Sequence, residues 1–442
     1  MEWDDVTPAE MRAFIGCVIC MGMVVIKKLS RYWSEDIGPA FIRRAFARDR
    51  FMALLSKFHI SEPLPADQPS TDRLHKVRKL NDRLVDRFAI AFYPGQWLTV
   101  DEAMVGFKGK CVMKQSMPNK TQDSGFKVWL LVDCETNFVV KFEVYTGKKE
   151  DGPEHGLSHD VVLRLVTELR RMAWHGIGMD GFFSSCHLFK ELYSEGRLAV
   201  ATTRHWVTGF PQAPLLINKK LKQGQFIARQ QPLSRDEALT VVSWMDRKPV
   251  NLLTTTANPL ELSTCRRWRK TRKAGGKGRH MQLSCPKVLE TYMQYMRGVD
   301  VYSQRESYAR IGRKTPRWWP HLAWFMIDIA INNACVLYNL RTTTPKLTST
   351  QFREQLMHLL VGEFTQRKKR GRPEKVHIRA DEPHHIPTKL LQQQPCMVCA
   401  RKVVLTDGQH KPRTREGCQT CGRACHFSCW KEHLPVELEE DE

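Results

Sequence analysis

The sequence predicts an α/β protein with a mixed sheet, a helical N-terminal region and a small cysteine-rich module near its C-terminus. Three observations support this prediction. Up to about residue 92, apolar residues recur at three and four positions, which is the periodicity of helices. Between residues 97 and 201, short apolar runs alternate with two amphipathic stretches. Six of the fourteen cysteines lie between Cys396 and Cys429, in paired spacings that suggest a metal module in a reduced compartment.

Length and composition indicate several folded units. The chain has 442 residues, of which 42% are apolar and 26% charged, so it can bury more than one core. Lys and Arg outnumber Asp and Glu by 69 to 47, and the formal net charge of +22 favours a polyanionic partner, with nucleic acid the first candidate. No apolar run reaches the roughly 18 residues of a membrane span, and the acidic start is unlike a signal peptide. We therefore expect a protein without a membrane partner that is not secreted.

The elements follow in this order. Residues 1–95 are predicted as a helical region, divided by the proline-rich loop 62–69. Strands are expected at 97–101, 126–132 and 138–145, and turn-forming residues at 133–137 join the last two. A helix near 160–172, a strand at 176–180, a helix near 185–194 and a strand at 197–201 come next. This alternation predicts a mixed sheet.

The second half divides into three further parts. Residues 209–285 contain short strands and a basic loop, and we interpret them as an inserted domain. Helical periodicity resumes in residues 286–342, which would complete the domain begun by residues 96–208. Residues 343–394 have the composition of a helical and basic linker, and a zinc-binding module is expected at 395–435.

Three aspartates are candidate metal ligands. Asp101 and Asp180 each end an apolar strand, and Asp300 lies in a later predicted helix. An ionised carboxylate at the end of a buried strand is costly unless a cation or hydrogen-bond donors meet it. Cleavage of phosphodiesters with two Mg²⁺ (or Mn²⁺) ions requires carboxylates that converge from separate elements. Asp at a strand end is also a common turn or capping residue, so the spacing leaves both interpretations open.

Around these aspartates the sequence resembles the piggyBac transposase family. The resemblance rests on LTVDEAMVGFKGK at 98–110, MDGFFSS at 179–185 and YMRGVD at 295–300, with further motifs at 201–204, 244–250 and 313–319. It implies an RNase H-like catalytic domain of the cut-and-paste type, with Asp101, Asp180 and Asp300 as the catalytic, metal-binding residues. It also implies a homodimer that acts on double-stranded DNA, namely transposon terminal repeats and a TTAA target. The helical region 1–95 would then serve dimerisation or DNA binding.

The sequence departs from the family pattern at supporting positions. Ser303 stands where the family usually has a further Asp, Gly181 stands where Asn is usual, and the family's acidic N-terminal region is not seen before Glu2. Serine is a poorer Mg²⁺ ligand than a carboxylate. Two functions therefore stay open: cleavage and strand transfer at transposon ends, or a catalytically silent, transposase-derived protein that binds DNA or chromatin. Asp246 matches no catalytic position of the family, and we interpret it as a turn residue.

The cysteines and histidines near the C-terminus have the spacing of zinc ligands. Two thiolates separated by two residues can hold one tetrahedral ion, and about forty residues need such an ion for stability. We expect about two structural Zn²⁺ ions, held by eight residues: Cys396, Cys399, Cys418, Cys421, Cys425, His426, Cys429 and His433. The resemblance implies a cross-braced module, but the spacing does not show which pairs share an ion. His433 is shifted by one position from the family pattern, and His410 is the alternative ligand.

Two basic segments and one aromatic pair are candidate DNA contacts. The first segment, predicted as a surface loop or else a solvated linker, contains eight basic residues: Arg266, Arg267, Arg269, Lys270, Arg272, Lys273, Lys277 and Arg279. The second contains Arg370 and Arg372 in the Arg-Gly-Arg-Pro core of an AT-hook, which also resembles a nuclear-import cluster and predicts a nuclear protein. Trp318 and Trp319 begin an apolar helix, where core packing is expected for at least one. The resemblance places the pair near the active site, where Trp319 would stack on an unpaired base.

Overall fold

The computed structural model describes two compact units, Met1–Gln366 and Arg367–Glu442. The described residues are 3–442 apart from 63, 66–69, 119–121, 149–151, 153–154, 168, 170–174, 205–208, 210–220, 236, 257, 259, 270–277, 303–309, 314, 342–344, 367–386, 403–410, 420 and 433–442.

The N-terminal part of the first unit is helical, as the periodicity predicts. It contains α1 (Pro8–Met23), the short 3-10 helix η1 (Leu29–Trp33), α2 (Ala40–Ala45), α3 (Arg48–Lys57) and α4 (Arg78–Ala91). α1 begins at Pro8 because the Thr7 hydroxyl accepts a hydrogen bond from the Glu10 N–H, and proline suits the first helical position. α1 packs against α10 (Ser349–Val361), so the two ends of this unit share one hydrophobic core.

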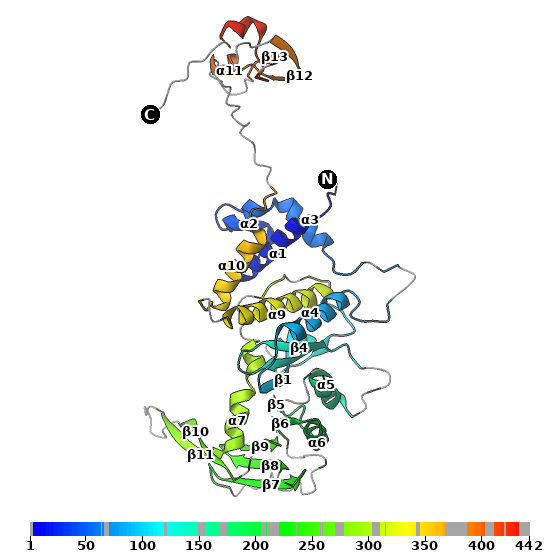
Figure 1. The fold of residues 1–442 in the computed structure, drawn as a ribbon, viewed down its shortest axis with the longest axis vertical. Coiled ribbons are helices and arrows are strands. Elements are labelled where there is room, and N and C mark those ends of the chain that lie inside the picture. Colours follow the sequence, from blue (N-terminus) through cyan, green and yellow to red (C-terminus); the bar gives the residue numbers. More distant parts are fainter. Residues whose placement is uncertain are drawn as a thin grey trace. The chain divides into compact units, whose positions relative to one another are not determined.

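A mixed sheet of nine strands lies in the described part of this unit (Figure 1). The strands are β1 (Trp97–Gly106), β2 (Gln115–Ser116), β3 (Ser124–Asp133), β4 (Val139–Val144), β5 (His175–Met179), β6 (Arg197–Thr202), β7 (Phe226–Pro232), β8 (Ala238–Met245) and β9 (Pro249–Thr254). Their order is β2-β3-β1-β5-β6-β9-β8-β7, with β4 also paired to β3. β1, β5 and β6 run parallel, and the other pairs are antiparallel, which confirms the mixed sheet.

The predicted turn between β3 and β4 is present. The Asp133 carboxylate accepts hydrogen bonds of 2.8 Å from the backbone N–H groups of Thr136 and Gly95. Asn137 has a φ of 62°, in the left-handed region that Asn tolerates better than most residues. These residues therefore fix the register of the hairpin.

Helices cover both faces of the sheet. Phe142 and Glu143 are neighbours in β4 and so point to opposite faces. Glu143 forms an ion pair of 2.8 Å with Arg164 of α5 (Leu157–Val166), whereas the Phe142 ring lies 6.2 Å from the Phe88 ring of α4. α6 (Cys186–Ser194) is hydrogen-bonded to α5 on the first face, and α9 (Trp319–Asn339) contacts α4 on the second (Figure 1).

The segment predicted as an insertion is partly continuous with this sheet. β9 pairs with β6, with Val200 opposite Thr254, and β8 and β7 follow outward. β10 (Leu262–Arg269) and β11 (Arg279–Pro286) form a separate two-stranded hairpin. Residues 209–285 therefore lengthen the sheet as well as adding a hairpin, and α7 (Lys287–Tyr295) returns the chain to β1 and β6.

α9 is the core helix of this unit. It is the one helix among the described residues whose length and hydropathy would suit a membrane span, but 67% of that window is buried inside the fold. Its Asn333 side chain accepts a hydrogen bond of 2.8 Å from the Val139 N–H and donates one of 2.9 Å to the Val139 carbonyl. Its composition is thus explained by packing on the sheet.

The second unit is small and built around cysteines. β12 (Pro387–Pro395) pairs with β13 (Arg413–Cys418), and two short helices, α11 (Cys399–Lys402) and η3 (Phe427–Glu432), complete its described part. Its hydrophobic cluster contains Cys396, Val398 and Cys425 as the buried members. So small a core agrees with a need for a metal ion.

Candidate active site and zinc centre

Asp101 and Asp180 occupy neighbouring positions on two parallel strands. The pairing of β1 with β5 runs from Trp97 opposite Gly176 to Val100 opposite Met179. Asp101 and Asp180 are the next residues of these two chains. Because parallel strands lie about 4.8 Å apart and residues in register point to the same face, the two carboxylates project together where β5 ends.

Asp101 does not end its strand, contrary to the prediction. β1 continues to Gly106 because its antiparallel pairing with β3 persists as far as Gly106 opposite Gly125. The parallel partner β5 stops beside Asp101, and Asp101 is 8% exposed. The strand end that the sequence predicted therefore belongs to β5 and Asp180.

Asp300 approaches the same face from a helix that is distant in sequence. The Tyr295 ring stacks on Trp97 of β1, with centroids 4.3 Å apart and an angle of 2°. Gly298 lies so close to β1 that a Cβ atom there would be 2.6 Å from the Thr99 methyl group. Trp97, Thr99 and Asp101 share one face of β1, since alternate residues do. Residues 298–302 are helical, so Asp300 follows this contact and is exposed beside the site.

The pKa of Tyr292, in α7, is affected by all three carboxylates. Burial raises the pKa of its phenol, and the negative charges of Asp180, Asp101 and Asp300 raise it further, while the hydrogen-bonded Thr202 side chain lowers it. Tyr292 is half-buried. Its role could not be inferred from the sequence, which shows only that it lies on the helix leading to Asp300. The phenol is therefore neutral at physiological pH and lies among three acids.

The three carboxylates suit a hard cation. The Oδ1 atom of Asp101 accepts a hydrogen bond of 2.7 Å from the Glu102 N–H, and that of Asp180 accepts one of 2.9 Å from the Phe182 N–H. Within the described part of the chain, the three carboxylates are not among the groups whose ligand atoms all lie within 4.8 Å of one another. Carboxylate oxygens are nevertheless the kind of ligand that Mg²⁺ prefers, and Mg²⁺ keeps further coordination positions for water and phosphate.

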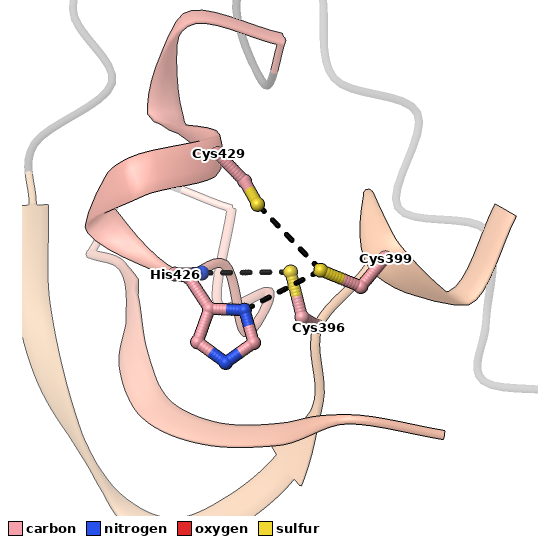
Figure 2. Close-up of side chains that lie close together, drawn as sticks. All are labelled: Cys396, Cys399, His426 and Cys429. Atoms are coloured by element: carbon pink, nitrogen blue, oxygen red, sulfur yellow. Dashed lines mark hydrogen bonds between the residues drawn. The ribbon is translucent and has the colours of Figure 1, made fainter. Parts of the chain in front are cut away.

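Four predicted zinc ligands meet in the second unit. Figure 2 shows Cys396, Cys399, His426 and Cys429 pointing toward one another, with ligand atoms all within 4.8 Å. The Cys399 Sγ atom is 3.6 Å from Cys429 Sγ and 3.5 Å from His426 Nδ1. Ligands of a tetrahedral Zn²⁺ ion, with Zn–S of about 2.3 Å and Zn–N of about 2.0–2.1 Å, lie about 3.5–3.8 Å apart. This set of three cysteines and one histidine is therefore compatible with zinc.

The pKa values of two thiols in this set are shifted in opposite directions. Burial raises the pKa of Cys396, but the backbone N–H groups of Cys399, His426 and Val398 outweigh burial and lower this pKa to about 6. The hydrogen bond with Cys429 raises the pKa of Cys399 to about 11. A cation would stabilise all three thiolates together, since metal binding displaces thiol protons.

The pairing of the zinc ligands is interleaved. Cys396 and Cys399 meet His426 and Cys429. Cys418 and Cys421 lie between these two pairs in the sequence but do not belong to this close set. Such interleaving agrees with a cross-braced module. A tight turn holds Cys418 near Cys421, with the Gly422 N–H donating to the Cys418 carbonyl at 2.8 Å, and burial raises the pKa of Cys425 to about 12. His433 and His410 lie outside the described residues, so the second ion remains a prediction.

Comparison with known proteins supports one family. The sequence pattern of the family described as Transposase IS4 matches residues 1–335 of this chain. PiggyBac transposable element-derived protein 3 of Homo sapiens is 25% identical over 441 residues, covering 97% of this chain and 70% of that protein. The chain belongs to the IS4/piggyBac-type transposase family.

Further relatives of this transposase family agree with the assignment. PiggyBac transposable element-derived protein 5 of Homo sapiens is 24% identical over 381 residues, covering 81% of this chain and 68% of that protein. The fold is similar to that in the cryo-EM structure of a piggyBac transposase synaptic complex with hairpin DNA, with a TM-score of 0.72 and 22% sequence identity. That similarity covers 85% of this chain and 76% of the other.

The basic segment of this transposase family member is a hairpin for part of its length. Arg266 is exposed on β10 and Arg279 is exposed on β11, so the predicted loop is shorter than expected. β-pairing reaches Arg269 opposite Arg279. Lys270, Arg272, Lys273 and Lys277 lie outside the described residues, as does the Arg269 side chain. Trp268, which is 49% exposed, is an aromatic residue on this hairpin that sequence reasoning did not select.

Arg267 has a structural partner. Its Nε atom is 3.0 Å from Asp246 Oδ2, and its guanidinium lies 5.4 Å from the centroid of the Trp244 ring. Asp246 is therefore more than a turn residue, because it holds β10 against the β8–β9 connection. The prediction that Arg267 contacts DNA is weakened by this ion pair.

Trp319 is buried, contrary to the prediction that it stacks on a base. It is 5% exposed, and its ring lies 5.8 Å from Phe58 in the core. Trp318 is half-buried, 6.4 Å from Phe126. Both tryptophans pack because α9 begins here against the sheet. Arg370, Arg372 and Ser303 lie outside the described residues.

Proposed function

We propose that this chain is a Mg²⁺-dependent DNA transposase of the piggyBac type, which cleaves at transposon ends and joins the freed 3′ hydroxyl to target DNA. The observation that carries this proposal is the convergence of Asp101, Asp180 and Asp300 on Tyr292. Carboxylates from two parallel strands and a distant helix are the arrangement that metal-assisted phosphoryl transfer requires.

The roles of the residues follow from their positions. Asp101 and Asp180, fixed by the β1–β5 register, and Asp300 would hold two Mg²⁺ or Mn²⁺ ions. Such ions, when bound, activate the attacking oxygen and stabilise the leaving oxygen. The Tyr292 phenol keeps its proton at neutral pH and can donate a hydrogen bond to a phosphate oxygen. The net charge of +22 supports binding of DNA along the surrounding surface.

The partners and location form part of the same proposal. Double-stranded DNA is the substrate, and a homodimer would bring two transposon ends together. Support comes from the similar structure, which is described as a synaptic complex with hairpin DNA. The basic cluster that contains Arg370 and Arg372 supports a nuclear location.

Cleavage of DNA that carries the terminal repeats of the element tests the proposal. We expect Asp101→Asn, Asp180→Asn and Asp300→Asn each to lower cleavage in Mg²⁺ by at least about a thousandfold, because each removes a charge that binds the ions. Folding and DNA affinity should change little. Asp246→Ala is the matched control, since it removes an acid that pairs with Arg267, and it should cut at close to the wild-type rate.

A silent, DNA-binding role is the alternative, and the two departures Ser303 and Gly181 favour it. A Cβ atom at Gly181 would be 3.4 Å from the Thr202 hydroxyl, which is an ordinary contact, so the backbone position has room for the first atom of a side chain. If the wild-type chain binds terminal-repeat DNA but never cuts in Mg²⁺ or Mn²⁺, the enzyme proposal fails. Cleavage by a Gly181→Asn, Ser303→Asp variant alone would then show that the supporting residues were lost.

A further inference from the structure

Three histidines and a glutamate form a cluster between α5 and α6. The His159 Nε2 atom is 2.8 Å from the Glu191 Oε2 atom, and the His159 Nδ1 atom is 3.5 Å from the His187 Nδ1 atom. The His155 ring lies 5.1 Å from the rings of both His159 and His187, which are 4.9 Å apart. Ligand atoms of His159, His187 and Glu191 all lie within 4.8 Å of one another.

The hydrogen bond to Glu191 decides which nitrogen of His159 is available. A carboxylate can only accept, so the Nε2 atom of His159 carries the proton. The Nδ1 atom of the neutral ring then presents its lone pair toward His187. At 3.5 Å this contact is too long for a strong hydrogen bond between two nitrogens. His159 is 3% exposed, so its orientation is set by packing and by Glu191.

The spacing is that of imidazoles around one metal ion. For tetrahedral Zn²⁺ with Zn–N of about 2.0–2.1 Å, two ligand nitrogens lie about 3.4 Å apart, and ring centroids about 5 Å apart. The observed values are 3.5 Å and 4.9–5.1 Å. A carboxylate bonded to the far nitrogen of a ligating histidine is a common second partner in zinc sites.

We propose that His155, His159 and His187 bind a transition-metal ion, Zn²⁺, and that Glu191 orients His159. His155 is not in the set of ligand atoms within 4.8 Å of one another, but it is exposed and precedes α5, and its ring would turn toward the ion on binding. This site is distinct from the carboxylates and from the cysteine set, and it does not depend on the proposed function.

The position of the site gives it a role. α5 leads into β5, and α6 follows β5 directly, so the N-termini of both helices lie where β5 ends. His187 comes seven residues after Asp180. An ion at this point would join the two helices and stabilise the loop that carries Asp180 and Phe182.

Titration of the metal-stripped full chain with Co²⁺ tests the site. Co²⁺ bound by imidazoles gives visible absorption without the thiolate charge-transfer band that marks the cysteine set. We expect the wild-type chain to bind one equivalent of Co²⁺ more than His187→Gln, an exposed substitution that should leave the fold intact. Glu191→Gln retains all three imidazoles and should lower the Co²⁺ affinity of this site by about 10–100-fold.

His59→Gln is the matched control, because His59 is exposed and outside the cluster, and it should bind as the wild type does. Excess Zn²⁺ should also raise the melting temperature of the wild-type chain more than that of His187→Gln. Equal Co²⁺ stoichiometry and equal spectra for the wild type and His187→Gln would overturn the proposal. An unchanged affinity in Glu191→Gln would overturn the orienting role of Glu191.

Discussion

The Tyr292 side chain lies near three negatively charged carboxylates. Burial raises the pKa of this phenol and the negative charges of the three carboxylates raise it further, so the phenol stays protonated at neutral pH. The Thr202 side chain fixes it by a hydrogen bond. A protonated, positioned hydroxyl is a donor for the negatively charged phosphate that the carboxylates and their ions would bind.

Tyr292→Phe should therefore reduce cleavage by about tenfold, which corresponds to the loss of about one hydrogen bond, while leaving DNA affinity almost unchanged. Single-turnover cleavage of terminal-repeat DNA in Mg²⁺ measures this change. Tyr295→Phe is a matched control, since Tyr295 contacts Trp97 through its ring. Equal rates for Tyr292→Phe and the wild type would assign Tyr292 to packing alone.

Individual residues were predictable to different degrees. Asp101, Asp180 and Asp300 could be selected because motifs surround them, and the register of β1 and β5 provides the physical reason for the first two. Tyr292 was missed because its role depends on the approach of α7 to the sheet, which the periodicity of the sequence does not contain. The family resemblance predicts that Trp319 stacks on a base, whereas the apolar helix it begins equally suits core packing. Only the burial of Trp319 distinguishes the two.

Among the elements, the β10–β11 hairpin has the charge of a DNA-binding arm. Replacing its basic residues other than Arg267 by Gln should weaken binding to DNA of any sequence. The seven residues are Arg266, Arg269, Lys270, Arg272, Lys273, Lys277 and Arg279. The plot of log affinity against log salt should lose about 0.9 in slope for each phosphate contact removed.

Arg267→Gln is the control for this experiment, because Arg267 pairs with Asp246 and should contribute little to the salt slope. Fluorescence anisotropy with labelled duplex DNA at several salt concentrations gives both slopes. If the slope of log affinity against log salt is unchanged after the seven replacements, the hairpin has a structural role instead.

The contact between α9 and α10 depends on a buried ion pair. The Arg353 Nη2 atom is 2.5 Å from the Asp328 Oδ1 atom, and both residues are fully buried. We expect Arg353→Met to destabilise the first unit by about 3–5 kcal/mol, because it leaves the Asp328 carboxylate without its cation. The double variant Asp328→Leu, Arg353→Met should recover most of this loss. Urea unfolding measures both, and a loss of less than about 1 kcal/mol for the single variant would contradict the expectation.

The helical character of the N-terminal region and the alternation of strands and helices from β3 to β6 could be predicted, because the apolar residues there have a clear period. The two-residue strand β2 was not predicted. The extension of the sheet by β7, β8 and β9 could not be predicted. It depends on the pairing of β9 with β6, which are distant in sequence, and local patterns do not encode such pairing. The same limit explains why the end of β1 was predicted wrongly at Asp101. The apolar run ends there, but the strand continues because it is paired with β3.

At the scale of the whole molecule, the chain combines a large unit with extensive hydrophobic cores and a small unit whose core has only a few buried residues. Chelation of the full chain should therefore unfold Arg367–Glu442 and leave Met1–Gln366 folded. Limited proteolysis with mass spectrometry should show new cleavage sites throughout the small unit, and in the large unit at most in the loop after β5. Cys399→Ser should lose one Zn²⁺ by metal analysis, whereas Cys111→Ser, outside the cluster, should lose none. Protection of the small unit after thorough chelation would exclude a structural role for the ion.

The spacing of the cysteines was sufficient to predict a metal module, because cysteine pairs two residues apart in a reduced protein mostly bind metal ions. It was not sufficient to assign the partners. That assignment needed the fold of the small unit, which brings Cys396 and Cys399 to His426 and Cys429.

The approach of the Asp300 helix to β1 has a consequence for the timing of synthesis. The third carboxylate leaves the ribosome about 200 residues after Asp101, which at about 5–20 residues per second is a delay of about 10–40 seconds. During that interval the nascent chain has Asp101 and Asp180 but lacks the residue that completes the set. A prematurely terminated chain would likewise carry an incomplete set, so the proposed cleavage of DNA would become possible only after the sheet and its hairpin have been made.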